Sequence, residues 1–281
     1  MSVNYLNHSI TDFSQLGKEK QAAYMNADPF PNIIFDDFFD EAILSKVADE
    51  FPDLSKQQNV ASFNNYNELK KLATKGGSLF GDTTKSLLCY LNSAPFLEFL
   101  QDLTGIKETL LPDPYYIGGG YHEIKSGGLL KIHADFNKHD MTKLDRRINL
   151  LIYLNKDWEE SYGGYLELWD TGMTHAAVKI LPVFNKVAIF STTDFSYHGH
   201  PDPLTCPPDR SRRSIALYYY SNGRPQNEIS HGEHSTIYVN RHGVETDTVE
   251  KTSKNVSNVL KGIMRDILPP IIVRTIKRIV R

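Results

Sequence analysis

The feature that most constrains the fold is a series of short, alternating apolar runs between residues 113 and 220, separated at close spacing by Gly, Asn, Asp or Pro. A period of two residues is typical of β-strands, and the spacing leaves no room for intervening helices. Strands that follow one another directly favour an antiparallel sandwich or barrel over a βαβ sheet. Seven runs are expected to be strands: residues 115–124, 129–136, 148–154, 165–169, 176–181, 187–191 and 214–220.

The first third of the chain has a different pattern. Residues 37–50 carry apolar side chains near helical spacing and are followed by Pro52, so a helix is expected there. Residues 81–99 predict two further helices with a break near Pro95, and the apolar run 29–35 predicts a short strand. The expected fold class is therefore mainly β with N-terminal helices.

Composition narrows the kind of protein. The 281 residues include 31 Lys and Arg against 34 Asp and Glu, and a net charge of −3 gives no reason to expect a nucleic-acid partner. The two cysteines, Cys89 and Cys206, exclude a disulfide framework or a thiolate zinc cluster. The sequence shows no apolar run of membrane-spanning length, and its start lacks the charged and apolar regions of a signal peptide. We therefore expect a cytoplasmic protein.

A candidate metal site lies in the second expected strand. His133 and Asp135 are two residues apart, so in a strand they point to the same face. A third ligand is expected from His198, just after the strand 187–191, with His200 as the alternative because the two have the same parity. Two histidines and one carboxylate make the facial triad of non-haem Fe(II) oxygenases, which leaves coordination positions open. Other histidines, at positions 122, 139 and 175, are expected on the surface or in loops.

The last expected strand begins with a candidate carboxylate receptor. Arg212 and Ser214 share one face of that strand, whereas Arg213 would face outward. A guanidinium group binds both oxygens of a carboxylate, and a hydroxyl adds a third hydrogen bond. An HxD pair, a later histidine and then RxS is the order expected of an oxygenase that binds 2-oxoglutarate.

On these residues the region from about 121 to 220 resembles the Fe(II)- and 2-oxoglutarate-dependent dioxygenases of the prolyl 4-hydroxylase type. The resemblance implies a double-stranded β-helix, or jelly roll, with the iron at its mouth. The matching segments are HADF at 133–136, RRINLLIYLNKDW at 146–158, GGYLELWD at 163–170, the segment around His198, and RRSIALYYY at 212–220.

The resemblance also implies roles for individual residues. His133, Asp135 and His198 would be the iron ligands. Arg212 would bind the distal carboxylate of 2-oxoglutarate, with help from Ser214 and Tyr153. Asn149 shares the parity of Tyr153 in the strand 148–154, so if Tyr153 points inward, Asn149 is expected to line the site as well.

The function implied is a dioxygenase that hydroxylates a C–H bond and releases succinate and CO2. The substrate class is a prolyl residue, an amino acid or another small molecule, and ascorbate is a further cofactor of such enzymes. A carboxylate at position 135 favours hydroxylation over halogenation. With Gly or Ala at this position, a halide ion could take the place of the carboxylate at the metal. The alternative is a non-enzymatic jelly-roll module that binds metal or serves as a membrane-associated scaffold.

The end of the chain stands apart in charge. Residues 251–281 carry eight Lys or Arg and one acid, with apolar residues on one helical face. Such a segment predicts a helix that covers the core, an oligomer contact, or a weak contact with an anionic membrane surface. The expected organisation is an N-terminal helical support (1–110), a jelly-roll core (111–225) and a C-terminal extension (226–281).

Overall fold

A computed structural model of the chain describes residues 4–228, 232–244 and 247. The chain divides into two units, Met1–Val239 and Asn240–Arg281. In the second unit Arg241 forms an ion pair with Asp247, with 2.9 Å between Nε and Oδ2. The basic segment 251–281 lies outside the described residues, and the predicted boundaries near 110 and 225 stay predictions. None of the described helices has the length and apolarity needed to cross a membrane.

Four α-helices precede most of the sheet. They are α1 (Phe13–Met25), α2 (Glu41–Asp49), α3 (Asp82–Leu91) and α4 (Ala94–Thr104). Aspartates cap two of them, since Asp12 accepts a hydrogen bond from the backbone of Gln15 and Asp40 from that of Ile43. The break between α3 and α4 is confirmed, with Pro95 in the first turn of α4, where proline is tolerated. Helix α1 was not predicted, because its sequence is weakly amphipathic and buries only Gly17 and Tyr24.

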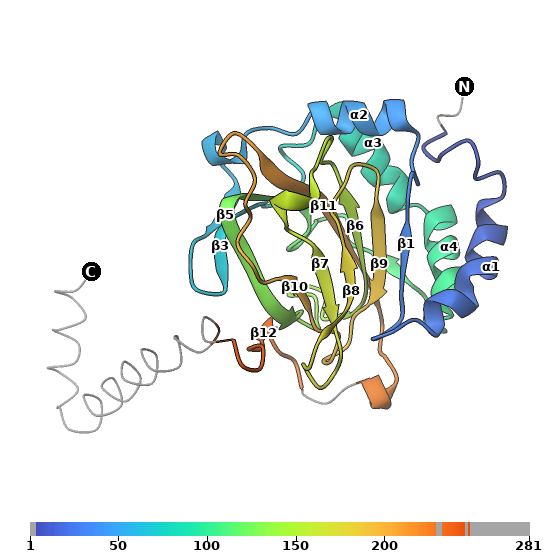
Figure 1. The fold of residues 1–281 in the computed structure, drawn as a ribbon. Helices are drawn as coiled ribbons and strands as arrows, with labels where there is room; N and C mark the ends of the chain where they lie inside the picture. Colours follow the sequence, from blue (N-terminus) through green and yellow to red (C-terminus); the bar gives the residue numbers. More distant parts are fainter. Residues whose placement is uncertain (1–3, 229–231, 245–246, 248–281) are drawn as a thin grey trace, which may run out of the picture. The chain divides into compact units, whose positions relative to one another are not determined.

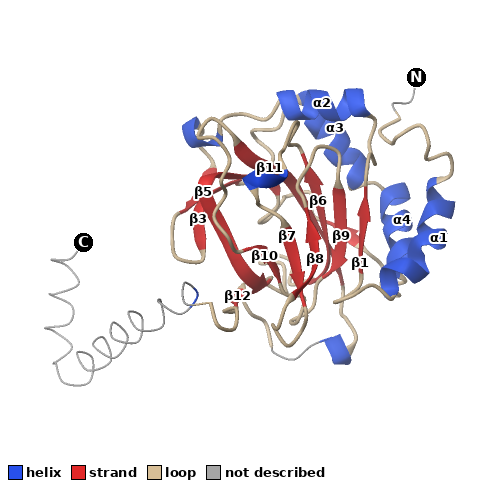
Figure 2. Ribbon diagram, in the orientation of Figure 1, coloured by secondary structure: helices blue, strands red, loops and turns tan. Residues whose placement is uncertain are grey.

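Twelve strands among the described residues form one curled sheet in which every strand pair is antiparallel (Figures 1 and 2). The main path runs β1-β9-β6-β11-β5-β10-β7-β8, while β2, β3, β4 and β12 pair outside it. The mainly β fold class is confirmed. The bounds are β1 (Asn32–Phe35), β2 (Val60–Phe63), β3 (Glu68–Thr74), β4 (Leu111–Pro112), β5 (Gly120–Ala134), β6 (Asp145–Tyr153), β7 (Leu166–Trp169), β8 (Ala176–Ile180), β9 (Val187–Ser191), β10 (His198–His200), β11 (Ser211–Ser221) and β12 (Ile237–Tyr238).

The short strands β4, β10 and β12 were not predicted, and two larger details of the sheet also differ from the sequence prediction. The runs 115–124 and 129–136 are not separate strands, because β5 continues through Gly127 and Gly128. Gly127 has φ +75°, and its amide bonds to Leu204 O, while a Cβ on Gly128 would lie 2.7 Å from Leu69 O. These glycines therefore permit close backbone approach within a strand and do not form a turn. The hairpin formed by β2 and β3 was also not predicted. It lies in the first third of the chain, where the sequence pattern indicated mainly helices.

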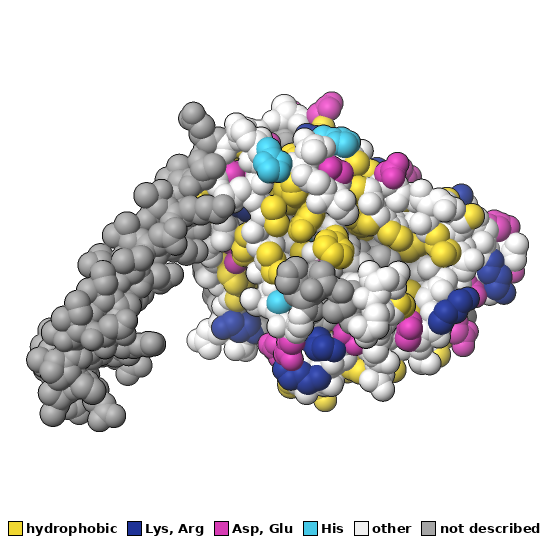
Figure 3. Space-filling model, turned by 90° about the horizontal axis from the view of Figure 1, so that it is seen from below, with side chains coloured by type: hydrophobic (Ala, Val, Ile, Leu, Met, Phe, Trp, Pro, Cys, Tyr) yellow, Lys and Arg dark blue, Asp and Glu magenta, His cyan; other side chains and the backbone are white. Residues whose placement is uncertain are grey.

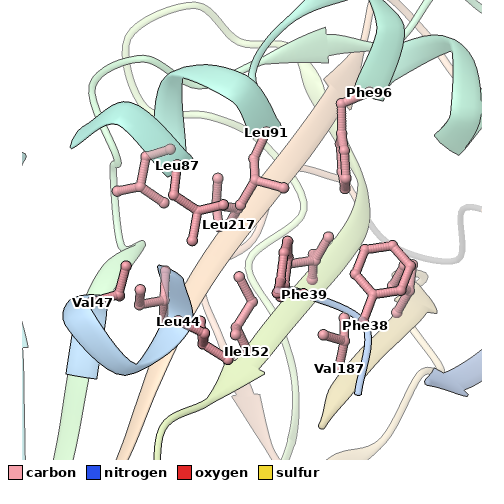
Figure 4. Packing of buried hydrophobic residues seen from close by; sticks show 14 of the residues in the cluster. Phe38, Phe39, Leu44, Val47, Leu87, Leu91, Phe96, Ile152, Val187 and Leu217 are labelled. Atoms are coloured by element: carbon pink, nitrogen blue, oxygen red, sulfur yellow. The ribbon is translucent and has the colours of Figure 1, made fainter. Parts of the chain in front are cut away.

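The core lies between the helices and the outer face of the sheet. On β6, Ile148, Leu150 and Ile152 face the helices, whereas Asn149, Leu151 and Tyr153 face the interior of the curled sheet. Leu217 of β11 and Val187 of β9 meet α2, α3 and α4 through side chains such as Leu44, Leu91 and Phe96 (Figure 4). Because one face of each strand packs against the helices, the other face points into the interior of the curled sheet.

Candidate functional site

Three predicted ligands meet at one end of the curled sheet. His133 near the end of β5 pairs with His198 of β10 in the sheet register, and Asp135 follows directly after β5. Asp135 Oδ1 lies 3.6 Å from His133 Nε2, and its Oδ2 lies 3.4 Å from His198 Nε2. One ligand atom from each residue lies within 4.8 Å of the others, so the three side chains can share one metal ion.

Hydrogen bonds fix the orientation of both imidazole rings. Nδ1 of His133 lies 2.8 Å from the carbonyl oxygen of Lys131, and Nδ1 of His198 lies 2.9 Å from that of Ser196. A carbonyl accepts, so Nδ1 carries the proton in each ring and the Nε2 lone pair faces Asp135. Burial lowers the pKa of His198 to about 4, against the opposing effect of Asp135. An imidazole that carries its proton on Nδ1 keeps the Nε2 lone pair for a divalent metal ion.

Asp135 is held as a carboxylate by two side chains of β6. Arg146 Nη2 donates to Asp135 Oδ2 at 3.0 Å, and the Asn149 amide donates to the same oxygen at 2.7 Å. Burial alone would raise the pKa of Asp135, but Arg146 and the two histidines hold it well below its usual range. The carboxylate therefore stays ionised and keeps Oδ1 free of these donors, as a metal ligand requires.

Arg146 is a site residue that sequence reasoning missed. Its guanidinium also donates to Asn149 Oδ1 and lies between the rings of Phe136 and Tyr218, 4.3 and 3.4 Å from their centroids. Strand parity alone would turn Arg147 inward with Asn149. The register between β6 and β11 shifts here, however, because Tyr219 pairs with Ile148 and Tyr220 with Arg146. A β-bulge of this kind is set by long-range pairing, so the parity of a single strand could not have revealed it.

The predicted carboxylate receptor lies on the inner face of β11. Arg212 is 6% exposed, and it donates from Nε to Gly164 O at 2.8 Å and from Nη2 to the Tyr153 hydroxyl at 3.2 Å. Ser214 is buried two residues further along the same face. Arg213 lies on the opposite face, where its Nε donates to Ser211 Oγ and its guanidinium lies over Phe51. These contacts orient Arg212 toward the interior.

A small cavity connects the histidine and arginine ends of the site. It has a volume of about 80 Å³. Its lining includes the three candidate ligands, together with Arg146, Asn149, Leu151, Leu166, His200, Arg212 and Ser214. Tyr153 reaches the site through its bond to Arg212. The structure thus brings all the sequence-predicted site residues together, and it also includes His200.

A larger groove of about 840 Å³ opens over the same histidine and carboxylate. Its walls are formed by four elements: the hairpin β2–β3, the turn at residues 115–118, the loop that follows β5, and strand β12. Tyr115 and Met141 are exposed at its rim. On the face shown in Figure 3, hydrophobic side chains gather near the middle, while most charged side chains lie towards the edges. The apolar lining suits a substrate larger than an amino acid.

Of the three histidines predicted on the surface or in loops, His122 differs from the prediction, and His139 lies in a loop but is buried. His122 of β5 lines both the cavity and the groove, and burial lowers its pKa to about 3. His139 is in a loop but is only 2% exposed, and its Nε2 lies 3.5 Å from Asp113. The burial of His139 depends on how the loops pack against the sheet, and the local sequence pattern carries no information about that packing. His175 is exposed, as predicted.

Comparison with known proteins finds a similarity to one family. A family model of the 2OG-Fe(II) oxygenase superfamily matches residues 119–253, which include the three candidate ligands and Arg212. This part of the chain is therefore similar to the superfamily in sequence. This similarity implies Fe(II) and 2-oxoglutarate, and the donor set of two imidazoles and one carboxylate fits Fe(II). The buried guanidinium and hydroxyl groups at the other end fit the distal carboxylate of 2-oxoglutarate.

Individual relatives agree with this assignment. Prolyl 3-hydroxylase OGFOD1 of Mus musculus is 32% identical over 87 residues, which are 29% of this chain and 15% of the mouse protein. A Trichoplax adhaerens prolyl hydroxylase, solved with a hypoxia inducible factor peptide fragment, has a TM-score of 0.56 at 18% identity, over 76% of this chain and 92% of that one. A Pseudomonas putida prolyl-4-hydroxylase has a TM-score of 0.53 at 13% identity, over 75% and 100%. The structural likenesses confirm the jelly-roll fold.

Proposed function

We propose that the chain is an Fe(II)- and 2-oxoglutarate-dependent dioxygenase that hydroxylates a C–H bond of a prolyl residue. The observation that carries the proposal is the convergence of two Nε2 atoms and one carboxylate beside a cavity that ends at a buried arginine. The match of residues 119–253 to the superfamily model supports the same activity. The non-enzymatic module considered from the sequence is disfavoured, because a purely structural metal site would not need an adjoining receptor for a carboxylate.

Each residue of the site has a distinct part in this proposal. His133, Asp135 and His198 would hold the metal on one side and leave its other positions open. Bound iron would supply the redox chemistry by which 2-oxoglutarate and O2 become succinate and CO2 while one oxygen atom enters the substrate. Arg212, with Tyr153 and Ser214, would fix the distal carboxylate. The buried walls of the cavity would limit access of water.

We propose a peptidyl prolyl residue as the substrate, ahead of free proline or another small molecule. The groove over the metal site is open and far larger than the cavity, so it could accept an extended chain whose side chain reaches the metal. The solved relative from Trichoplax adhaerens carries a peptide. Free amino acids would leave most of the apolar lining in contact with water.

The activity is tested first without a substrate. Anaerobic Fe(II) and 2-oxoglutarate added to the protein should give a weak visible metal-to-ligand charge-transfer band. Air and a set of proline-containing peptides should then give succinate and a peptide heavier by one oxygen atom, with ascorbate omitted in parallel to measure its contribution. Absence of the band, together with absence of succinate for every peptide and for free proline, would refute the enzyme and leave the metal-binding module.

The location and the tail are separate proposals. We infer a cytoplasmic protein, because the two cysteines are not paired in a disulfide. From the charge pattern alone, we also infer that the basic segment 251–281 makes a weak contact with anionic membrane surfaces or with a second copy. Truncation after residue 250 should abolish sedimentation with phosphatidylserine liposomes while leaving 2-oxoglutarate turnover unchanged. Equal sedimentation of the two proteins, or none by the full chain, would count against the membrane contact.

Arg146→Met gives a further prediction about the metal site. Methionine keeps the unbranched apolar stem between Phe136 and Tyr218 but removes the bond to Asp135. Partners of a metal ligand typically contribute about 10- to 100-fold to metal affinity. Fe(II) affinity, measured anaerobically by titration, should fall within that range. Lys143→Met, which removes an exposed cation three residues before Arg146, should leave Fe(II) affinity unchanged. An equally large loss of Fe(II) affinity in Lys143→Met would show that the effect comes from the change in net charge and not from the bond to Asp135.

A further inference from the structure

His200 is a buried histidine to which the proposed function gives no part. It lies at the end of β10, two residues after His198, so both side chains face the interior of the curled sheet. The residue is 2% exposed. Neither of its ring nitrogens has a hydrogen-bond partner among the residues that the structure describes.

A buried imidazole without partners is costly. Removing a polar group from water without a new hydrogen bond costs about 1–3 kcal/mol, and buried polar groups of native proteins are nearly always paired. The apolar neighbours Ile124, Leu130 and Leu166 line the same cavity, and an aliphatic residue would pack there without this cost. An unpaired histidine at this place therefore points to a ligand that enters the cavity.

The charges around the cavity indicate what kind of ligand this is. In the sheet register His198 pairs with His133, whereas His200 pairs with Leu130 and Arg212 with Ile124, so His200 and Arg212 lie further along β5 from the metal site. Ser214 lines the same cavity, and Asp135 is the one carboxylate among the described residues of the lining. Asp135 is engaged by Arg146 and Asn149 at the opposite end. The Arg212 end thus offers hydrogen-bond donors and no anion, which suits a carboxylate group.

We propose that His200 donates a hydrogen bond to the distal carboxylate of 2-oxoglutarate, beside Arg212, and so helps to select a 2-oxo acid that carries a second carboxylate. The inference rests on the proposed function and extends it by one cosubstrate-binding residue. An imidazole has at least one N–H in either protonation state, so the donor is present throughout the working pH range.

The test measures binding of two 2-oxo acids to the anaerobic Fe(II) protein through the charge-transfer band. One probe is 2-oxoglutarate and the other is 2-oxobutyrate, which binds metal in the same way but has no distal carboxylate. The variants are His200→Leu, which removes both nitrogens, and His200→Gln, which retains an N–H donor. His175→Leu is the matched control, because it makes the same change at an exposed histidine outside the cavity lining. Near-ultraviolet circular dichroism verifies that each variant is folded.

His200→Leu is expected to raise the Kd of 2-oxoglutarate roughly ten-fold or more, the range for a hydrogen bond to a charged group. The Kd of 2-oxobutyrate should stay unchanged. For 2-oxoglutarate, the Kd of His200→Gln should lie between those of the parent and His200→Leu, and the Kd of His175→Leu should match that of the parent. Unchanged affinity for 2-oxoglutarate in His200→Leu, or an equal loss for both acids, would overturn the role of His200 alone. Absence of any band in the parent would instead overturn the proposed function, and this inference with it.

Discussion

Asp135→Ala should abolish 2-oxoglutarate turnover and, at the same time, destabilise the protein. Loss of a metal ligand should cost more than the roughly 100-fold that loss of an outer partner can cost. The loss of stability has a separate cause, since Arg146 is 1% exposed and donates to this carboxylate. Removing one member of a buried ion pair costs about 3–5 kcal/mol, because the remaining charge is left in the interior. Succinate formation and urea unfolding measure the two effects.

The double variant Asp135→Ala/Arg146→Met separates chemistry from stability. Removal of both charges leaves no unpaired ion, so the double variant should recover most of the free energy of unfolding while staying inactive. Recovery of both stability and turnover would show that Asp135 is not a metal ligand. Failure to recover stability would show that Arg146 is held by Asn149 and its stacking rings, independently of Asp135.

Strand parity predicted the inner face of the sheet well because the strands are buried on both faces. Tyr153 and Asn149 point inward, since Ile148, Leu150 and Ile152 are needed by the helices on the other side. The same rule separates Arg212 from Arg213 on β11. Alternation is therefore informative wherever the two faces of a strand meet different surroundings.

Features that depend on non-local pairing could not be predicted in this way. The register shift that turns Arg146 inward follows from how β6 meets Tyr219 and Tyr220 of β11. The hairpin β2–β3 is likewise defined by its pairing with β5, and its Lys-rich strand carries little hydrophobic signal. His200 has the same parity as His198. Only the three-dimensional arrangement shows that Asp135 meets His198, while His200 lies opposite Leu130 and outside the group of three ligands.

Arg212→Ala is expected to have the largest effect on the cosubstrate requirement. A guanidinium that binds both oxygens of a carboxylate makes two charge-assisted hydrogen bonds, each of about 1.5–3 kcal/mol, so the Kd for 2-oxoglutarate should rise on the order of 10²-fold or more. Arg212→Lys keeps the positive charge but lacks the two parallel N–H donors of the guanidinium group. It should therefore give a Kd for 2-oxoglutarate between those of the parent and Arg212→Ala. Titration of the charge-transfer band measures both values.

Arg213→Ala is the matched control, because it removes the same side chain one residue away on the same strand. Its contacts are with Ser211, Glu123 and the ring of Phe51 on the opposite face of β11, so it should alter stability slightly and 2-oxoglutarate affinity not at all. The reverse order of effects would place the carboxylate receptor on the outer face. Because Tyr153 and Ser214 lie on the face of Arg212, such a result would remove their proposed parts as well and would leave the metal ligands as the only supported elements of the site.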